Sequence, residues 1–144
     1  MATDNKELSR RILEEVWNKQ NLSAADDMIA ADFVNHDPQS PVNVQGIEGY
    51  KQGVRYYLNA FSDCNFTVED EISEGPMVVT RWTVNGTHTG NLGAIPATGR
   101  RISVTGISCG RVENGKMVEA WTNWDTLGMM QQLGVLSATA QRAA

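Results

Sequence analysis

The feature that most constrains the fold is a change in the spacing of apolar residues near position 65 of this 144-residue chain. Before that position apolar residues recur at helical spacing, and after it they alternate with polar residues in β-branched runs. Helices gathered before an antiparallel sheet are typical of α+β proteins. The sequence therefore predicts a cone-shaped α+β barrel, in which three N-terminal helices pack on a curved, mostly antiparallel sheet and enclose a pocket.

Each of the three helices is predicted from a start signal or an apolar stripe. A capping box in residues 4–7 opens a helix predicted over residues 4–20. Residues 23–26 form a second cap, which starts a short helix, and a third helix runs from about residue 46 to residue 61. The loop between the last two helices contains Pro38, which cannot continue a helix.

Four segments of alternating polarity follow the helices and are predicted to be strands. They cover residues 66–72, 77–89, 101–112 and 117–125. Asn114 and Gly115 join the last two segments, and an Asn-Gly pair between alternating runs is the strongest short signal for a hairpin. Residues 91–99 are punctuated by glycine and proline and are predicted to form a loop.

A single domain is expected over residues 1–136, because a chain of this length buries roughly two thirds of its unfolded surface and has room for an internal cavity. Residues 137–144 are small and polar and are expected to form a disordered tail. The 17 acidic residues against 12 basic ones give a net charge of -5, which argues against binding to nucleic acid or to a membrane.

The sequence also predicts a cytoplasmic protein. Its first residues lack the basic start and apolar run of a signal peptide, and no apolar stretch has the length of a membrane span. Cys64 and Cys109 have no paired spacing and are expected to be reduced thiols.

Histidine, the side chain best suited to proton transfer near neutral pH, occurs only twice, each time within a polar cluster. His36 lies in Asn-His-Asp-Pro, and His88 lies in Gly-Thr-His-Thr-Gly. A third cluster, residues 121–125, supplies Asp125 beside two tryptophans. An acid/base site is expected if these clusters converge.

Strand parity indicates which of these side chains face the pocket. One face of segment 77–89 is largely apolar and ends at His88, which could instead be a core histidine bonded to a threonine or a carbonyl group. In the last strand Val118, Thr122 and Trp124 share the apolar side. Asp125 falls on the opposite side, where it could instead cap the following helix.

The remaining side chains also have structural alternatives. His36 stands before Asp-Pro and could order a turn rather than line the pocket mouth. Aromatic walls suit a flat hydrophobic ligand, although tryptophans are more often core or subunit-interface residues. Two histidines with Asp37 or Asp125 would be enough for a metal site, but no pair has the close spacing of familiar sites, so no metal is expected.

Several segments resemble the SnoaL-like polyketide cyclase family over nearly the whole chain. They are residues 14–19, 32–38, 86–90, 95–101, 124–125 and 132–134. The resemblance implies a nuclear-transport-factor-two-like α+β cone that is open at one end and forms a homodimer or a higher homo-oligomer. It also implies that no cofactor or metal is used.

The resemblance is less specific about the reaction. In the cyclases of this family an aspartate on the last strand starts an intramolecular aldol closure, and Thr122 stands at that position here. Asp125 matches a second shared aspartate, while Asn35 and His88 match polar pocket positions. Relatives without the acid include cofactor-independent hydroxylases.

Our leading hypothesis is an enzyme of cyclase or isomerase type, acting on a hydrophobic, carbonyl-bearing ligand of polyketide type. His88 would be the general acid/base, Asn35 and Thr122 would bind a carbonyl or enolate oxygen, and Asp125 or His36 would orient or share the proton. Four aromatic side chains are expected to contact the ligand: Trp17, Tyr57, Trp82 and Trp124. The alternatives are a non-catalytic small-molecule-binding protein and a cofactor-independent, oxygen-dependent hydroxylase.

Overall fold

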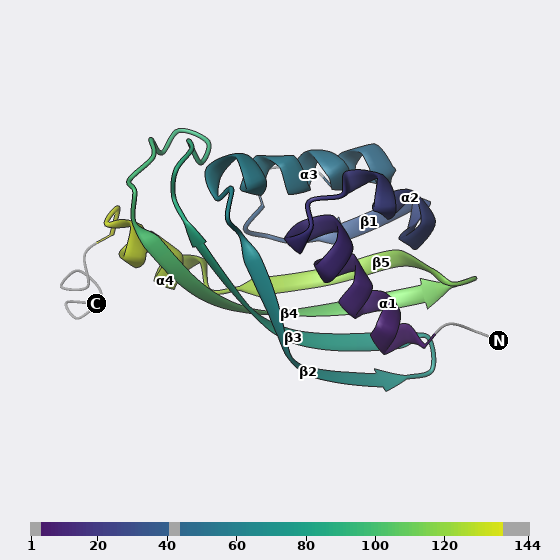
Figure 1. Cartoon of the computed structure of the whole chain (residues 1–144). Coiled ribbons are helices and arrows are strands. Elements are labelled where there is room, and N and C mark those ends of the chain that lie inside the picture. The colour runs from purple at the N-terminus through teal and green to yellow at the C-terminus, as the bar shows by residue number, and fades with distance from the viewer. Residues whose placement is uncertain (1–3, 41–43, 137–144) are drawn as a thin grey trace.

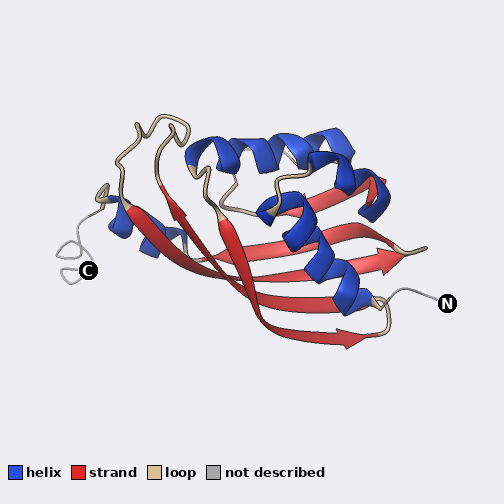
Figure 2. Cartoon of the chain, in the orientation of Figure 1, coloured by secondary structure: helices blue, strands red, loops and turns tan. Residues whose placement is uncertain are grey.

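The computed structural model describes residues 4–40 and 44–136 as an α+β fold (Figures 1 and 2). The expected tail, residues 137–144, lies outside the described residues. The elements are α1 (Asn5–Arg11), the π-helical segment η1 (Ile12–Asn18), the 3-10 turn η2 (Leu22–Ala24), α2 (Ala25–Met28), β1 (Ile29–His36), α3 (Gly46–Ala60), β2 (Asn65–Glu74), β3 (Met77–Thr87), β4 (Arg101–Glu113), β5 (Lys116–Trp124) and α4 (Thr126–Leu133).

The five strands form one sheet in the order β1-β5-β4-β3-β2. The strands β2 to β5 pair antiparallel, and β1 joins β5 in parallel. The predicted α+β class and mostly antiparallel sheet are therefore confirmed. Among the described residues the sheet is not closed on itself, and the helices cover one of its faces (Figure 1).

The strand β1 was not predicted from the sequence, although it carries Asn35 and His36 and ends directly before Asp37. Its register with β5 shifts between Ile29 and Val34, so apolar and polar residues do not alternate along it. It is also an edge strand, and the partner that holds it lies more than 80 residues further along the chain. Local polarity alone therefore gives little sign of a strand here.

The predicted hairpin turn and the start of the first helix are confirmed. Asn114 and Gly115 both have positive φ, 53° and 76°, as a tight hairpin between β4 and β5 requires. The side chain of Asp4 accepts a hydrogen bond from the Lys6 amide at 3.0 Å and caps α1. The predicted first helix has the expected extent, but it is π-helical beyond Arg11.

The predicted cap in residues 23–26 is wrong, because neither η2 nor α2 has a side-chain cap and the Ser23 hydroxyl instead donates to Oδ1 of Asn21.

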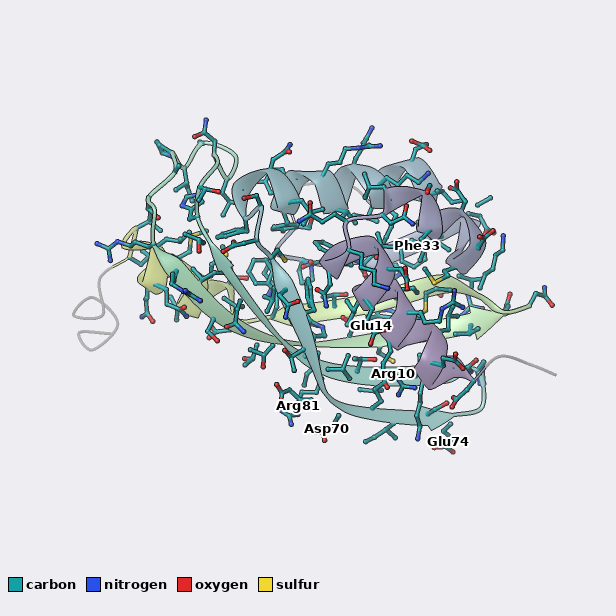
Figure 3. All side chains as sticks on the ribbon, in the orientation of Figure 1. Arg10, Glu14, Phe33, Asp70, Glu74 and Arg81 are labelled. Carbon is teal, nitrogen blue, oxygen red and sulfur yellow. The ribbon has the colours of Figure 1, made fainter. Side chains whose placement is uncertain are left out.

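Two clusters of buried side chains join the helices to the sheet. The first includes Val16, Phe33 and Val54, and Figure 3 places Phe33 between the helices and the sheet. The second includes Val104 and Leu133 and lies where α4 packs on β4. In the part of the chain that the structure describes, no helix is long and apolar enough to cross a membrane.

Candidate functional site

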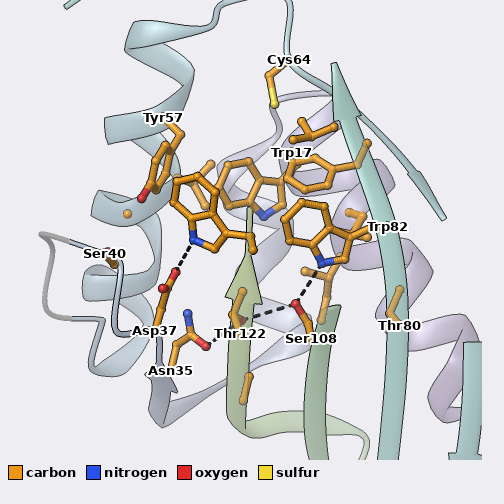
Figure 4. Close-up of a pocket in the computed structure, with 18 of the residues that line it drawn as sticks. Trp17, Asn35, Asp37, Ser40, Tyr57, Cys64, Thr80, Trp82, Ser108 and Thr122 are labelled. Atoms are coloured by element: carbon orange, nitrogen blue, oxygen red, sulfur yellow. Dashed lines mark hydrogen bonds between the residues drawn. The ribbon is translucent and has the colours of Figure 1, made fainter. Parts of the chain in front are cut away.

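A cavity of about 210 Å³ lies between the helices and the sheet, and its wall is mostly apolar (Figure 4). Both buried clusters contribute to the wall, through residues such as Phe33 and Val54 from the first and Val104 from the second. The helix pair α1–η1, the helix α3 and the inner faces of all five strands therefore enclose one common space. This confirms the expected pocket.

Strand alternation decides which polar side chains reach the cavity. On β3 the predicted inner face is confirmed, since Val78, Thr80 and Trp82 are buried. On β5 the side chains of Thr122 and Trp124 line the cavity, as predicted.

The prediction that Val118 shares this inner face is wrong. The register of β4 with β5 shifts between Arg111 and Val112, so Met117 pairs with Val112 and lines the cavity. A bulge of this kind inserts one residue and reverses the facing of those beyond it.

Asp37 is the one acidic residue among the described residues that line the cavity, and no lysine, arginine or histidine accompanies it there. Its Oδ2 accepts a hydrogen bond from Nε1 of Trp124 at 3.1 Å, and its Oδ1 accepts one from the Gln39 amide at 2.9 Å. Figure 4 shows Asp37 beside Asn35 at the same side of the cavity. The carboxylate is therefore held in place with one edge toward an apolar space.

From the sequence, Asp37 was expected in a turn, in a polar triplet at the pocket mouth or in a metal set, and it was not predicted as a catalytic residue. The alternation Phe33, Asn35, Asp37 could have placed it on the inner face, but only once β1 had been recognised as a strand. All three of these side chains line the cavity.

Tyr57 stands close enough to Asp37 for the two groups to influence each other. Burial raises the pKa of the Tyr57 phenol to about 12, and the negative charge of Asp37 adds to this effect. A hydrogen bond with Ser40 opposes it. Tyr57 is therefore a neutral hydroxyl group in the cavity at physiological pH.

Four polar side chains form a hydrogen-bonded row across the inner face of the sheet (Figure 4). Nε1 of Trp82 donates to Oγ of Ser108 at 3.0 Å, and the Ser108 and Thr122 hydroxyl oxygens are 3.4 Å apart. The Thr122 hydroxyl donates to Oδ1 of Asn35 at 3.1 Å. One residue comes from each of β3, β4, β5 and β1, which are consecutive in the sheet.

The four aromatic residues predicted to contact a ligand all line the cavity: Trp17, Tyr57, Trp82 and Trp124. Nε1 of Trp17 donates to the hydroxyl of Tyr50 at 2.9 Å, and burial raises the pKa of that phenol. The Tyr57 and Trp124 rings stand perpendicular, with centroids 6.1 Å apart. The indole N–H groups are thus paired within the protein and leave mostly apolar ring surface toward a ligand.

His88 is completely buried but is not among the residues that line the cavity. Its Nδ1 accepts a hydrogen bond from the Thr98 amide at 3.2 Å and lies 3.0 Å from the Thr98 hydroxyl. Its ring lies 5.2 Å from that of Phe61. The bond to Thr98 matches the alternative of a core histidine bonded to a threonine, but Nε2 is buried and has no hydrogen-bond partner among the described residues, so the ring is only half satisfied. The acid/base role of His88 stays a prediction.

His36 and Asp125 lie away from the cavity. The His36 side chain is exposed, contacts Glu119 through Nε2 at 2.7 Å and stacks on Trp121. Asp125 accepts a hydrogen bond from the Gly128 amide at 2.9 Å and caps α4, as the structural alternative predicted. The first and third clusters therefore meet at the cavity through Asn35, Asp37, Thr122 and Trp124, while the second cluster contributes Gly86 to the wall but not His88.

The described residues also include no group of three or more His, Cys, Asp or Glu side chains arranged to hold a metal ion. Burial raises the pKa of the Cys64 thiol, which lines the cavity, to about 12. Cys64 is therefore a neutral thiol near neutral pH rather than a reactive thiolate.

A helix-covered curved sheet with an apolar cavity and a few converging polar groups defines a small-molecule-binding α+β cone. The model of the SnoaL-like polyketide cyclase family matches residues 7–133, and the chain belongs to this family.

Curated and solved proteins agree with the family assignment. The chain is 33% identical over 135 residues to the aklanonic acid methyl ester cyclase DnrD of Streptomyces peucetius, covering 89% of each chain. A candidate polyketide cyclase from Acidithiobacillus ferrooxidans has a similar structure, with a TM-score of 0.83, 29% identity and coverage of 94% of this chain and 99% of that one. TsrD from Streptomyces laurentii superposes with a TM-score of 0.82 at 30% identity, covering 93% of this chain and 99% of TsrD.

Proposed function

We propose that this protein is an enzyme that closes a ring within a hydrophobic, carbonyl-bearing substrate of polyketide type, with Asp37 as the general base. The observation that carries the proposal is the one carboxylate that the described residues place in the cavity wall, that of Asp37. It is held by Trp124 and the Gln39 amide and lies two residues from Asn35. The names of the similar cyclases support the same class of reaction.

The chemistry needs a base for a carbon acid and a donor for the oxygen that becomes negative. Asp37 would take a proton from the carbon next to a carbonyl group, and the amide of Asn35 would donate to the enolate oxygen. The enolate carbon then attacks a second carbonyl carbon of the same molecule, and a carbon–carbon bond forms. The new alkoxide takes the proton back from Asp37, so the product is an isomer of the substrate and no further reactant is required.

The apolar wall supports this proposal in two ways. Because water is scarce around aromatic side chains, a hydrogen bond to the enolate is stronger there than in bulk water. The flat surfaces of Trp17, Trp82 and Trp124 suit fused aromatic rings and would hold the two reacting carbons close together. The proposed protein uses no cofactor and acts as a homodimer or higher homo-oligomer in the cytoplasm.

The test uses aklanonic acid methyl ester, the compound in the name of the similar cyclase. The full chain is incubated with the ester in chelator-treated buffer, and the products are followed by liquid chromatography with mass detection. The proposal expects a product of unchanged mass and altered retention. Ester that binds and is recovered unaltered would favour the non-catalytic binding protein, and a product heavier by one oxygen atom would favour the hydroxylase.

A further inference from the structure

The hydrogen bonds of the polar row Trp82–Ser108–Thr122–Asn35 all run in one direction, from donor to acceptor. This direction fixes the orientation of the side-chain amide of Asn35. An indole N–H can only donate, so Oγ of Ser108 accepts from Trp82 at 3.0 Å. At the other end the Thr122 hydroxyl donates to the amide oxygen of Asn35 at 3.1 Å. The contact between Ser108 and Thr122 is therefore made by the Ser108 hydrogen.

With this direction each hydroxyl hydrogen in the row has an acceptor. If the Asn35 amide were turned over, its NH₂ group would donate to Thr122, Thr122 would donate to Ser108, and the Ser108 hydrogen would be left without an acceptor in the row. Ser108 is half-buried, and a donor that is shielded from water and left without a partner costs free energy. The indole of Trp82 at the far end thus selects one of the two amide orientations of Asn35.

Backbone geometry supports the position of the first member of the row. The indole ring of Trp82 lies directly over Gly106, on the neighbouring strand, where any Cβ atom would collide with it. This close approach lets Nε1 reach Ser108, two residues further along β4. Packing against Trp82 therefore explains why residue 106 of this strand is a glycine.

We infer that Ser108 and Thr122 are positioning residues that hold the Asn35 amide with its NH₂ group toward the ligand. Within residues 4–40 and 44–136 the Asn35 amide is bonded through its oxygen and its Nδ2 donates no hydrogen bond, and Asn35 lines the cavity beside Asp37. Both hydroxyl hydrogens are used within the row, so neither Ser108 nor Thr122 is a free donor to the ligand. The inference rests on the proposed function only for the role of the amide toward an enolate.

The first test needs no ligand and measures the Asn35 side-chain amide by ¹⁵N NMR in the labelled full chain. Asn35→Asp identifies the resonance. Thr122→Val and Ser108→Ala should both shift it and speed exchange of its hydrogens about two- to tenfold, as expected for losing one net hydrogen bond. Thr122→Ser, which restores the hydroxyl, should return both quantities to the wild-type values. Backbone spectra confirm that each variant is folded.

An unchanged Asn35 resonance in folded Thr122→Val would overturn the inference. So would failure of Thr122→Ser to restore the wild-type signal, because the lost methyl contact rather than the hydroxyl would then be responsible.

The second test separates this inference from the proposed function. In the ring-closure assay Thr122→Val should lower kcat about tenfold with little change in KM, and it should have no further effect in an Asn35→Leu background. A further loss in that background would mean that Thr122 acts on the ligand itself, which overturns the positioning role. If the NMR result holds but the wild-type protein converts no ester, the proposed reaction fails and the oriented amide stands.

Discussion

The indole N–H of Trp124 donates to Oδ2 of Asp37 at 3.1 Å and joins the end of β5 to the residue that follows β1. This contact holds the carboxylate of Asp37, which directly follows β1, against the indole ring of Trp124 at the end of β5. The family resemblance implied an acid on the last strand, at the position of Thr122. In this chain the acid of the cavity instead follows the neighbouring strand, and Thr122 belongs to a hydrogen-bonded row.

The stability of the protein should fall at alkaline pH because of Tyr57. Its pKa is raised from 10.0 to about 12, mainly by burial and then by Asp37, so the folded state favours the neutral phenol. This contribution is complete below pH 10.0 and decreases as the pH rises toward 12, because the unfolded chain loses the proton first. Urea unfolding of wild type and Tyr57→Phe across this range should show a smaller slope in the variant. Equal slopes would contradict the assigned shift.

His88 can be tested for a structural or a catalytic role with two substitutions. His88→Leu removes the acceptor of the Thr98 amide and should cost about 1–3 kcal/mol of stability. His88→Asn keeps an acceptor near the position of Nδ1 and should recover part of that loss. If His88 were the general acid/base, both variants would lose activity alike even where His88→Asn restores the fold. Thermal unfolding and the ring-closure assay, run on the same samples, distinguish the two outcomes.

Asp125→Ala should weaken the fold and spare the reaction. The side chain caps α4 by accepting from the Gly128 amide at 2.9 Å, and loss of such a cap costs about 1 kcal/mol. Denaturant unfolding should report this loss, while kcat stays close to that of the wild type. A large fall in kcat with unchanged stability would instead support the catalytic role that the family resemblance suggested for Asp125.

Self-association should involve the outer face of the sheet. We propose that Ile107 and Trp121, which are 51% and 38% exposed on adjacent strands, lie in the interface of a homodimer or larger homo-oligomer. Replacing Trp121 by Glu should then give a monomer in light scattering. A Leu127→Glu variant, which changes an exposed apolar residue on α4, serves as the control. A wild-type protein that is monomeric at high concentration would contradict the proposal.

The sequence predicted the parts of this fold whose signals are local. The cap at Asp4, the turn at Asn114 and the buried face of β3 all follow from short-range patterns, and the structure confirms them. The bulge that turns Met117 inward and the pairing of β1 with β5 depend on contacts between distant segments, and local polarity does not encode them.

The residues of the site divide in the same way, into those that could be predicted from the sequence and those that depend on contacts between distant segments. Asn35, Thr122 and the aromatic wall could be predicted from parity and family resemblance, and all of them line the cavity. Asp37 was missed because its strand was missed, and a residue before proline is readily interpreted as part of a turn. His36 and Asp125 stood out by residue type, but the structure pairs both with groups outside the cavity.

The most direct test of the account is the rate of ring closure by Asp37→Asn, compared with Asp125→Asn as a matched substitution outside the cavity. The amide preserves the size of the side chain and an oxygen for the Trp124 indole, but it cannot act as the base. The account predicts that Asp37→Asn lowers kcat about a hundred- to ten-thousand-fold with little loss of stability, while Asp125→Asn stays within a few-fold of wild type. A folded Asp37→Asn protein that turns over as fast as the wild type would contradict it.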